Sequence, residues 1–585
     1  MASQRFALIL IKPSHYDDDG YVIQWWRSVV PSNTLAALHG LALDCQQRRV
    51  LGDGVEIDMY AFDETNTRIV PERIARLVGN AGLVCLVGVQ SNQYPRAMDI
   101  ARPLRRMGVS VAIGGFHVSG SLTMLPGIRP ELQEAIDLGI SLFAGEAEGR
   151  LDNVLRDAYR GELKPIYNYM DDLPNLAGVP TPFLPRQKIN RYVDNDAAFD
   201  AGRGCPFQCS FCTIINVQGR ISRRRTADDV EAIVRANAAQ GVANFFISDD
   251  NFARNKDWEE IFDRLIYLRD VAKLNIWFLI QVDTLCHRIP NFIEKAGRAG
   301  VEKVFIGLES ISPEALAGAK KRQNRITEYR EMMLAWKKAG AHLYAGYIIG
   351  FPTDTPESLM RDIEIVKREL PIDMLEFFFL TPLPGSEDHQ KLFKSGAPLE
   401  SDLNKYDLEH VCTTNPTMSR ETWEKVYRDA WRSYYSSEHI VRVMKRAFAL
   451  NVGTLRILYL MLAFRTSIEL EKVHPLQSGY FRLKYRRDRR PGMPLESPLV
   501  FYPKYAFGQI YKHLRLLGWI IYFGSIRFKL ARDPHRRDYT DEAMTPIRDD
   551  EFDSRDMYKT GAGTAAAIEK HRKENRARAK LTASG

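Results

Sequence analysis

The sequence predicts an α/β protein with an N-terminal doubly wound parallel sheet, a partial β/α barrel and a mainly helical C-terminal region. Short apolar stretches alternate with longer amphipathic ones over residues 1–150, and again over residues 194–384. The apolar stretches are almost continuous, which is typical of parallel strands that helices cover on both faces. Beyond residue 385 the alternation stops and helical spacing takes over.

Length and composition set the first limits. The chain has 585 residues, 45% hydrophobic and 26% charged, with a formal net charge of +8. This length is too great for one core and predicts three or four domains. No stretch reaches about eighteen uninterrupted apolar residues, so we expect no spanning helix. The short apolar run at residues 8–11 indicates a strand and not a signal peptide. Seven cysteines without regular pairing favour a reducing compartment such as the cytoplasm.

Changes in composition divide the chain into five segments. We expect a sheet domain over residues 1–166, a linker rich in Pro and Asp over 167–193, and the barrel over 194–385. A mainly helical domain follows over residues 386–540. The charged tail, residues 541–585, is expected to be disordered or to form a frayed helix.

In the first domain we expect strands over residues 6–11, 55–60, 83–89, 109–113 and 140–143, with helices between them such as 71–78 and 94–107. Ligands of such sheets bind at the carboxyl ends of the strands, and glycines there let a backbone approach the ligand closely. The candidate binding residues at these ends are Ser91, Asn92, Gly114, Gly115, His117, Gly145 and Glu146.

In the second region we expect strands over residues 196–201, 244–248, 276–282, 303–307, 344–349 and 374–379. Helices over residues 227–239, 257–271, 289–300 and 326–340 fall between them. Six such units fit a partial β/α barrel, whose chemistry is expected at the carboxyl ends of the strands.

Three cysteines follow the first barrel strand directly. Cys205, Cys209 and Cys212 have the spacing C-x-x-x-C-x-x-C. Thiolates are soft ligands that select zinc or iron–sulfur clusters. No fourth ligand of this kind follows nearby, and three thiolates on a four-iron cluster leave one iron open to a ligand. The residues alone therefore predict a site with three thiolates. A zinc site completed by a distant histidine and a surface cysteine cluster are the alternatives.

This spacing, with Phe211 just before the last cysteine, resembles the radical S-adenosylmethionine (SAM) superfamily. The resemblance covers about residues 195 to 385. It implies a [4Fe–4S] cluster on the three cysteines, whose open iron holds SAM. It also implies that one electron from the cluster cleaves SAM to a 5′-deoxyadenosyl radical.

Further strand ends are similar to the SAM-binding segments of that family. Asp249 and Asp250 end the second barrel strand, where the resemblance implies a carboxylate for the SAM ammonium group; an N-cap of the next helix is the alternative. Gln281 and Asp283 suit the ribose or the methionine carboxylate, or they are simply solvated.

The fourth and fifth barrel strands end in two more family-like segments. Gly307 and Glu309 resemble a Gly-Leu-Glu segment beside adenosine, although Glu309 could instead pair with a neighbouring Arg or Lys. Gly350 begins a Gly-Phe-Pro turn like the one that lies beside the adenine in the family, and a purely structural turn is compatible with that role.

The first 150 residues resemble the cobalamin-binding domains that precede some radical SAM barrels. The resemblance is carried by the segments around Gly114, Gly115, His117, Gly145 and Glu146. The histidine motif that supplies a lower cobalt ligand in many cobalamin proteins is absent; His15 stands at the equivalent place and its role stays open. We expect cobalamin in this domain, with His117 near the ligand and not on the metal. An empty domain is the alternative.

The C-terminal region contains two short apolar runs with basic flanks, residues 456–464 and 516–523. We expect buried helices of a domain that covers the substrate. Peripheral membrane contact, with a helix lying on an anionic bilayer, is the alternative. No RNA- or DNA-binding module is visible, so we expect no nucleic-acid partner.

Together the resemblances imply a cobalamin-dependent radical SAM methyltransferase. The expected substrate is a small or lipid-like molecule methylated at an unactivated carbon, and flavodoxin or ferredoxin is the expected electron donor. A radical SAM cyclase or rearrangement enzyme and a cobalamin- or redox-sensing binding protein are the alternatives. A methylthiotransferase is disfavoured because it needs three more N-terminal cysteines, and only Cys45 and Cys85 precede the linker.

Overall fold

The computed structural model describes residues 4–548, 551–552, 554–559 and 562–583. Its N-terminal part is a six-stranded parallel sheet in the order β3-β1-β4-β5-β6-β7. The order reverses between β1 and β4, which is the switch point of a doubly wound sheet and confirms the expected fold. The strands are β1 (Gln4–Lys12), β3 (Val55–Asp63), β4 (Gly82–Leu86), β5 (Ser110–Gly114), β6 (Ser141–Ala144) and β7 (Ile166–Asn168).

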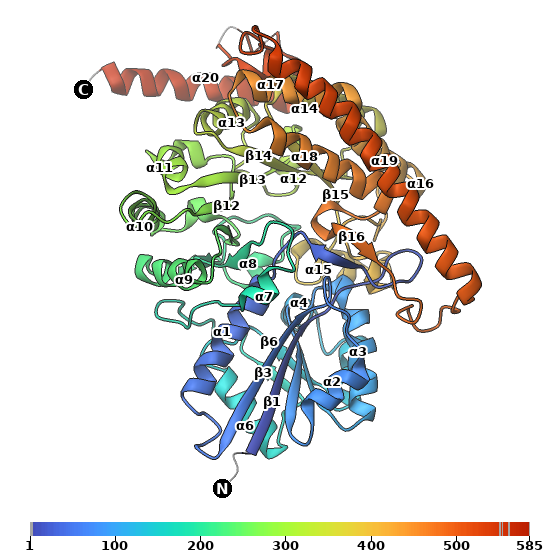
Figure 1. Cartoon of the computed structure of the whole chain (residues 1–585). Helices are drawn as coiled ribbons and strands as arrows, with labels where there is room; N and C mark the ends of the chain where they lie inside the picture. The colour runs from blue at the N-terminus through green and yellow to red at the C-terminus, as the bar shows by residue number, and fades with distance from the viewer. Residues whose placement is uncertain (1–3, 549–550, 553, 560–561, 584–585) are drawn as a thin grey trace.

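Helices cover both faces of this sheet (Figure 1). Alternate side chains of β1 explain why, because Leu8 and Leu10 enter one core while Ile9 and Ile11 enter the other. A strand that is apolar on both faces must be covered twice. One face carries α1 (Asn33–Gln47) and α6 (Leu151–Arg160), and the other carries α2 (Pro71–Val78), α3 (Tyr94–Arg106) and α5 (Pro130–Asp137).

The second sheet also has six parallel strands, in the order β15-β14-β13-β12-β11-β8. Strands follow one another in chain order, and within the described residues the two outer strands do not pair. This is the open β/α barrel that the sequence predicts. The strands are β8 (Ala197–Phe199), β11 (Asn244–Ile247), β12 (Trp277–Val282), β13 (Val301–Glu309), β14 (His342–Ile349) and β15 (Met374–Phe379).

Helices lie between the barrel strands, and α1 of the first domain packs against the edge strand β8. The apolar core therefore runs without a break from the first sheet into the barrel. The helices of the barrel are α9 (Ala227–Ala239), α10 (Trp258–Asp270), α11 (Phe292–Ala299), α12 (Pro313–Gly318), α13 (Tyr329–Lys338) and α14 (Pro356–Glu369).

The C-terminal region is mainly helical, as expected. α16 packs against α14 and β15, and α17, α18 and α19 pack on one another. α18 is partly buried, but only four of the 35 residues of α19 are buried. None of the helices among the described residues combines the length and the apolar composition needed to cross a bilayer. These helices are α15 (Glu387–Ser395), α16 (Arg420–Tyr434), α17 (Ser437–Ala449), α18 (Thr454–Thr466) and α19 (Pro498–Arg532).

A two-stranded antiparallel ribbon joins the two ends of the chain. β2 (Gln24–Ser28) pairs with β16 (Gly479–Leu483). Its two neighbouring tryptophans point to opposite faces, as strand geometry requires. Trp25 is buried, with its Nε1 donating to Gln477 O at 2.8 Å, whereas Trp26 is half exposed.

Within its described residues, the charged tail folds back onto the barrel helices and includes a helix. Phe552, Met557 and Tyr558 are buried and supply an apolar anchor that the charged composition concealed. α20 (Ala562–Ala583) then runs past α12. The tail residues 549–550, 553, 560–561 and 584–585 lie outside the described residues.

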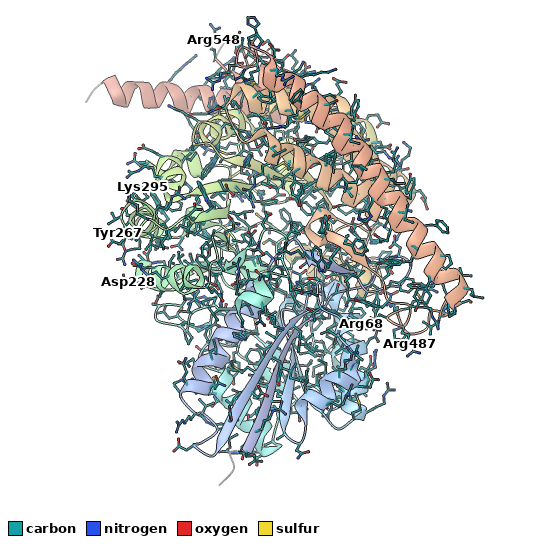
Figure 2. All side chains as sticks on the ribbon, in the orientation of Figure 1. Arg68, Asp228, Tyr267, Lys295, Arg487 and Arg548 are labelled. Atoms are coloured by element: carbon teal, nitrogen blue, oxygen red, sulfur yellow. The ribbon has the colours of Figure 1, made fainter. Side chains whose placement is uncertain are left out.

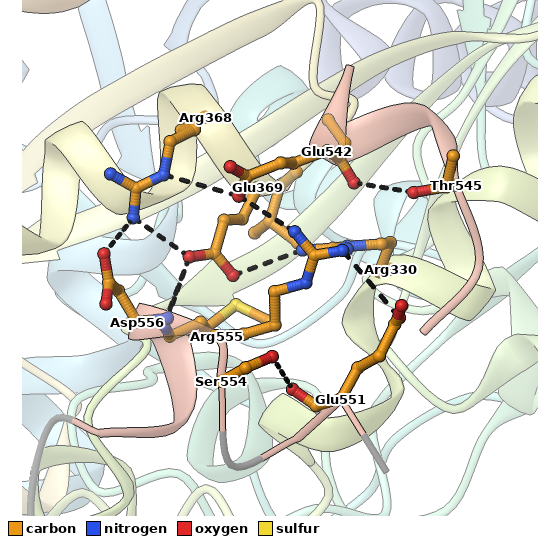
Figure 3. Close-up of polar contacts among 12 residues, drawn as sticks. Arg330, Arg368, Glu369, Glu542, Thr545, Glu551, Ser554, Arg555 and Asp556 are labelled. Carbon is orange, nitrogen blue, oxygen red and sulfur yellow. Dashed lines mark hydrogen bonds and ion pairs between the residues drawn. The ribbon is translucent and has the colours of Figure 1, made fainter. Parts of the chain in front are cut away.

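Ion pairs hold this tail in place (Figure 3). Glu369, at the end of α14, is fully buried and pairs with Arg330 of α13 at 3.2 Å. The same carboxylate accepts a hydrogen bond from the backbone N of Asp556 at 3.1 Å, and the Asp556 side chain pairs with Arg368. The tail therefore neutralises charges that the barrel helices carry.

Candidate functional site

The three cysteines lie in one loop between β9 (Gly202–Arg203) and α8 (Ile214–Val217), after the carboxyl end of β8. All three are free thiols; Cys209 is buried and the other two are partly buried. Gly204 precedes them with a φ of 93°, and a Cβ there would lie 2.7 Å from the carbonyl oxygen of Ile221. Only glycine fits this entry to the loop.

Each of the three sulfurs accepts a hydrogen bond from a protein N–H group. Such donors stabilise thiolates, and they tune the potential of iron–sulfur sites. The donors are the backbone N–H of Phe207 for Cys205, the Nε2 of Gln323 at 3.4 Å for Cys209, and the backbone N–H of Ile214 for Cys212.

The environment of the loop fits a polynuclear iron cluster. Burial raises the pKa of Cys205, and it raises the pKa of Cys212 to about 12, so the thiolates need a bound cation beside them. Among the described residues, no group of three or more His, Cys, Asp or Glu side chains converges closely enough to hold a single metal ion. A cluster does not need this convergence, because each thiolate binds a different iron.

A buried ion pair lies beside the loop. Lys321 pairs with Glu309, which ends β13 with a φ of 62°, and the Lys321 Nζ lies 5.8 Å from the centre of the Phe211 ring. Burial works against the ammonium, but Glu309 and the thiols of Cys209 and Cys212 raise the pKa of Lys321. The pair adopts the alternative that the sequence left open for Glu309.

Gly307 makes room for this ion pair. A Cβ there would lie 2.7 Å from Glu309 Oε1 and 2.8 Å from Lys321 Nζ. The packing of this ion pair therefore explains why a glycine stands at position 307 of the Gly-Leu-Glu segment. Its backbone carbonyl also accepts from Asn324 Nδ2 at 3.0 Å.

Asp249 and Asp250 hold the entry to the cysteine loop. Asp249 accepts from the backbone N of Ala201 at 2.6 Å, and Asp250 accepts from that of Gly204 at 3.4 Å. Burial raises the pKa of both carboxyls to about 7. Neither caps the following short helix, whose N-cap is Asn251. The carboxyl of Asp250 also acts electrostatically on Cys205 and Cys212.

Gln281 and Asp283 both lie at the end of β12, but the protein uses them differently. Gln281 is partly exposed, and its Nε2 donates to the backbone O of Asp249 at 3.3 Å. Asp283 accepts from Arg254 Nε at 2.6 Å and Nη2 at 2.8 Å, and from Asn251 Nδ2 at 2.9 Å. Its carboxylate is therefore engaged by the protein.

Gly350 forms a tight turn after β14. The carboxylate of Asp354 accepts from the backbone N of Gly350 and of Phe351, both at 2.9 Å. Gly350 has a φ of 109°, and a Cβ there would lie 1.9 Å from the ring of Trp423. Its structural role is therefore evident, as the sequence allowed.

A cavity of about 180 Å³, which opens to solvent, lies at the carboxyl ends of β4, β5 and β6. Four of the seven expected binding residues of the first domain line it: Gly114, Gly115, Gly145 and Glu146. Arg203, Val217 and Gln218, which flank the cysteine loop, line it as well. The cavity and the loop therefore share a wall.

The other three expected residues do not line this cavity. Ser91, Asn92 and His117 are buried together, with His117 Nδ1 3.1 Å from Ser91 Oγ. Burial lowers the pKa of His117 to about 3, and its ring lies 4.5 Å from that of Tyr94. His117 is therefore a neutral, packed side chain of α4 (Phe116–Met124).

Arg203 joins the cavity to the cysteine loop. Its Nη1 lies 2.6 Å from Glu146 Oε2 and its Nη2 lies 2.6 Å from Glu148 Oε1, both in the first domain. Its Nε lies 3.1 Å from Asp200, beside β8. All four side chains are at least nine-tenths buried. Two residues later in the chain comes Cys205.

Sequence reasoning missed Arg203, Lys321 and Gln323. Arg203 stands directly before Gly204 and Cys205, so its position in the motif was visible. Lys321 and Gln323 lie in a loop more than one hundred residues after the cysteines, and no local pattern marks them. Only the packing of that loop against the cysteines reveals them.

Comparison with known proteins gives a consistent result. Residues 201–366 match the family model of the radical SAM superfamily. This segment begins just before the cysteine loop and ends in α14.

Curated relatives match a larger part of the chain. The bacteriochlorophyllide d C-8(2)-methyltransferase of Chlorobaculum tepidum is 26% identical over 59% of this chain and 76% of its own length. The hopanoid C-2 methylase of Rhodopseudomonas palustris is 23% identical over 66% of this chain and 71% of its own length.

A solved structure has a similar fold. The radical S-adenosylmethionine methyltransferase TsrM of Kitasatospora setae, with cobalamin and a [4Fe–4S] cluster bound, matches with a TM-score of 0.53. The match covers 75% of this chain and 90% of that one, at 14% identity.

Proposed function

Since the chain is a radical SAM enzyme related to cobalamin-dependent radical SAM methyltransferases, we propose that it methylates an unactivated carbon of a small or lipid-like substrate and uses cobalamin to do so. One observation carries the proposal. The cavity of the first sheet and the cysteine loop are adjacent, and Arg203 forms part of their shared wall.

In this proposal Cys205, Cys209 and Cys212 hold the [4Fe–4S] cluster, and the cavity of the first domain holds cobalamin. When bound, the cluster supplies the electron that cleaves SAM, and cobalamin supplies the methyl group. Among the described residues that line the cavity there is no histidine. Cobalt would therefore lack a histidine ligand from this chain.

The chain's own residues position the reactants. The N–H groups that donate to the three sulfurs hold the cysteine loop in place. The buried ion pair of Lys321 and Glu309 lies beside this loop. Asp250 and Gln281 remain the candidates for contact with SAM, whereas Asp283 is already held by Arg254. Arg203 fixes the distance between the two cofactor sites, which radical chemistry needs because reacting groups must be aligned.

The substrate class rests on the relatives and on the C-terminal region. The names of two relatives describe methylation at carbon positions of a bacteriochlorophyllide and of a hopanoid. A hydrophobic substrate is consistent with the exposed apolar surface of α19. We further propose flavodoxin or ferredoxin as the electron donor and the cytoplasm as the compartment.

The first test is cofactor content after anaerobic purification and reconstitution. We expect about four irons and four sulfides, plus cobalamin, per chain. Replacing Cys205, Cys209 and Cys212 together with Ala should remove the iron, while the control variant Cys412→Ala, which alters a buried cysteine outside the loop, should keep it. Full iron in the triple variant would contradict the assignment of the site.

The second test is product analysis with dithionite-reduced protein, SAM and candidate substrates. A methyltransferase of this type forms both 5′-deoxyadenosine and S-adenosylhomocysteine. Deoxyadenosine without S-adenosylhomocysteine would instead indicate a cyclase or a rearrangement enzyme. Intact SAM in the presence of a reduced cluster would indicate a binding protein.

A further inference from the structure

The outer face of α19 is an exposed apolar stripe. Figure 1 shows α19 as a long helix along the outside of the molecule, packed on the C-terminal helices by one side only. Its inner side chains, such as Trp519 and Phe523, are buried. The opposite face repeats apolar residues at intervals of three, four or seven: Phe507, Ile510, Leu514, Leu517, Ile521 and Phe528.

These side chains are open to solvent to an unusual degree. Their exposed fractions run from 50% for Leu517 to 72% for Phe507. The stripe extends over about 32 Å at the helical rise of about 1.5 Å per residue. A contiguous exposed apolar surface of this length indicates a contact site for a membrane or for another protein.

The charges of α19 favour a membrane over a protein partner. The helix contains no Asp or Glu. Arg515, Lys529 and Arg532 are exposed, and within the described part of the chain no ion pair involves them. Lys504 and Lys512 are paired with Glu496 and Glu471. An apolar face with only cations beside it complements an anionic lipid headgroup layer.

A second copy of the chain fits this surface less well. Two such helices packed along their stripes would bring the cations of one helix near those of the other, with no carboxylate in either helix to neutralise them. α19 also cannot insert across a bilayer, because its inner side is fixed to α17 and α18. The arrangement is that of a helix that lies in the plane of the membrane surface.

We propose that α19 docks the protein on anionic membrane surfaces, with the Phe507–Phe528 stripe in the acyl boundary and Arg515, Lys529 and Arg532 at the headgroups. Aromatic rings of the neighbouring ribbon extend this surface. Phe481 of β16 contacts the ring of His513 at 5.5 Å, and Tyr480 and Trp26 of the same ribbon are half exposed. Rings of this kind are enriched at membrane interfaces.

The test is sedimentation of the full-length protein with vesicles. Vesicles of equal parts phosphatidylglycerol and phosphatidylcholine should bind the protein, and vesicles of phosphatidylcholine alone should bind it at least about tenfold less. Replacing Phe507, Leu514 and Ile521 together with Ser should weaken binding roughly 100-fold, since each side chain leaves the acyl boundary. Binding should also fall as salt is raised.

A matched control removes the same kind of side chain elsewhere. Met107, Tyr267 and Val271 are exposed apolar residues, and Figure 2 shows Tyr267 on the side of the molecule away from α19. The Met107→Ser, Tyr267→Ser, Val271→Ser variant should bind vesicles like the parent protein. Equal loss in both triple variants would overturn the proposal.

A second variant tests the proposal independently, in case the first variant does not fold. Arg515→Gln, Lys529→Gln and Arg532→Gln together leave the stripe intact and should reduce binding to the anionic vesicles at least about tenfold, with little change on neutral ones. Light scattering distinguishes the other occupant. A dimer in solution that dissociates in the Phe507, Leu514, Ile521 variant, without vesicle binding by the parent, would show that α19 joins two copies instead.

Discussion

At the residue scale, Lys321 links the cysteine loop to the barrel. Its ammonium is buried, and its carboxylate partner Glu309 is nearly so. Neighbouring Lys320 makes the same kind of pair with Glu387, but at the surface. Lys320 and Lys321 therefore form the same kind of ion pair, but only the pair of Lys321 is buried. A buried pair that loses one partner leaves an uncompensated charge, whereas a surface pair contributes little.

We therefore expect Lys321→Met to lower the free energy of unfolding by about 3–5 kcal/mol. The same change at Lys320 should lower it by less than about 1 kcal/mol. Equilibrium unfolding in urea of the two variants side by side is the measurement. Equal effects at the two positions would show that Glu309 has another partner or is protonated.

Glu376 provides a pH dependence. It is buried in β15, its Oε2 has no hydrogen-bond partner among the described residues, and burial raises its pKa to about 8. Between its ordinary pKa of 4.5 and about 8, the unfolded chain loses a proton that the folded protein retains. The contribution of Glu376 to stability is therefore complete at low pH and declines as the pH rises towards 8.

Glu376→Gln removes this titration. The variant should gain stability relative to the parent as the pH rises, by on the order of 4 kcal/mol at pH 8 and by little at pH 4.5. Urea unfolding at several pH values measures the difference. A stability difference that does not change with pH would mean that Glu376 is ionised in the folded protein.

The sequence could identify the residues whose chemistry is local. Cys205, Cys209 and Cys212 needed only their spacing. Ser91 and His117 were expected near the cofactor because they follow strands of the first sheet, yet their side chains turn away from the cavity. A loop position is visible in a sequence, but the direction of its side chain depends on packing from elsewhere in the chain.

At the element scale, the turn after β14 shows how one glycine sets a strand–helix connection. Gly350 lies with its Cα against the Trp423 ring, and Trp423 Nε1 donates to Ile349 O at 3.0 Å. The turn, β14 and α16 are thus locked together. Asp354 closes the turn by accepting from two backbone N–H groups.

Gly350→Ala should destabilise the protein by at least about 3 kcal/mol, because the new methyl group meets an aromatic ring and the backbone keeps a positive φ. Gly318→Ala is the control, since a Cβ there meets no atom within 4 Å. That change should stabilise α12 by about 0.5–1 kcal/mol. Thermal unfolding of both variants measures the two effects. A Gly350→Ala variant as stable as the parent protein would show that the turn accommodates a Cβ.

Most strands were predictable from the sequence to within a few residues, because near-continuous apolar runs such as residues 344–349 have few other interpretations. Long helices were harder. Residues 516–523 are as apolar as a core segment, and only the packing of α19 shows that one side of it faces solvent. The charged composition of the tail concealed a different feature, since three buried apolar residues pack this segment against the barrel.

At the scale of the whole molecule, Arg203 connects two domains through a buried guanidinium, and Arg223 pairs with Glu146 beside it. It satisfies Glu146 and Glu148 of the first domain and Asp200 beside the barrel. Such a network fixes relative position. Without Arg203, Glu146 would keep Arg223 and Asp200 would keep Arg225, but the buried Glu148 would lose the cation that pairs with it.

Arg203→Met should destabilise the folded protein by about 3–5 kcal/mol and make the unfolding of the two domains less cooperative. Arg48→Met removes an arginine whose ion pairs, with Asp44 and Asp152, are partly exposed, and it should lower stability by less than about 1 kcal/mol. Calorimetry would detect a second transition. One sharp transition at the parent temperature would mean that the apolar contacts between the domains suffice.

The β2–β16 ribbon has a consequence for biosynthesis. β2 leaves the ribosome among the first segments, but the strand that pairs with it is made only after both sheets. Throughout translation the edge of β2 and the indole of Trp25 stay uncovered, next to domains that can already fold. A nascent chain that stalls before residue 479 therefore exposes an unpaired N-terminal strand that can bind other chains, and chaperones and proteases recognise such a state.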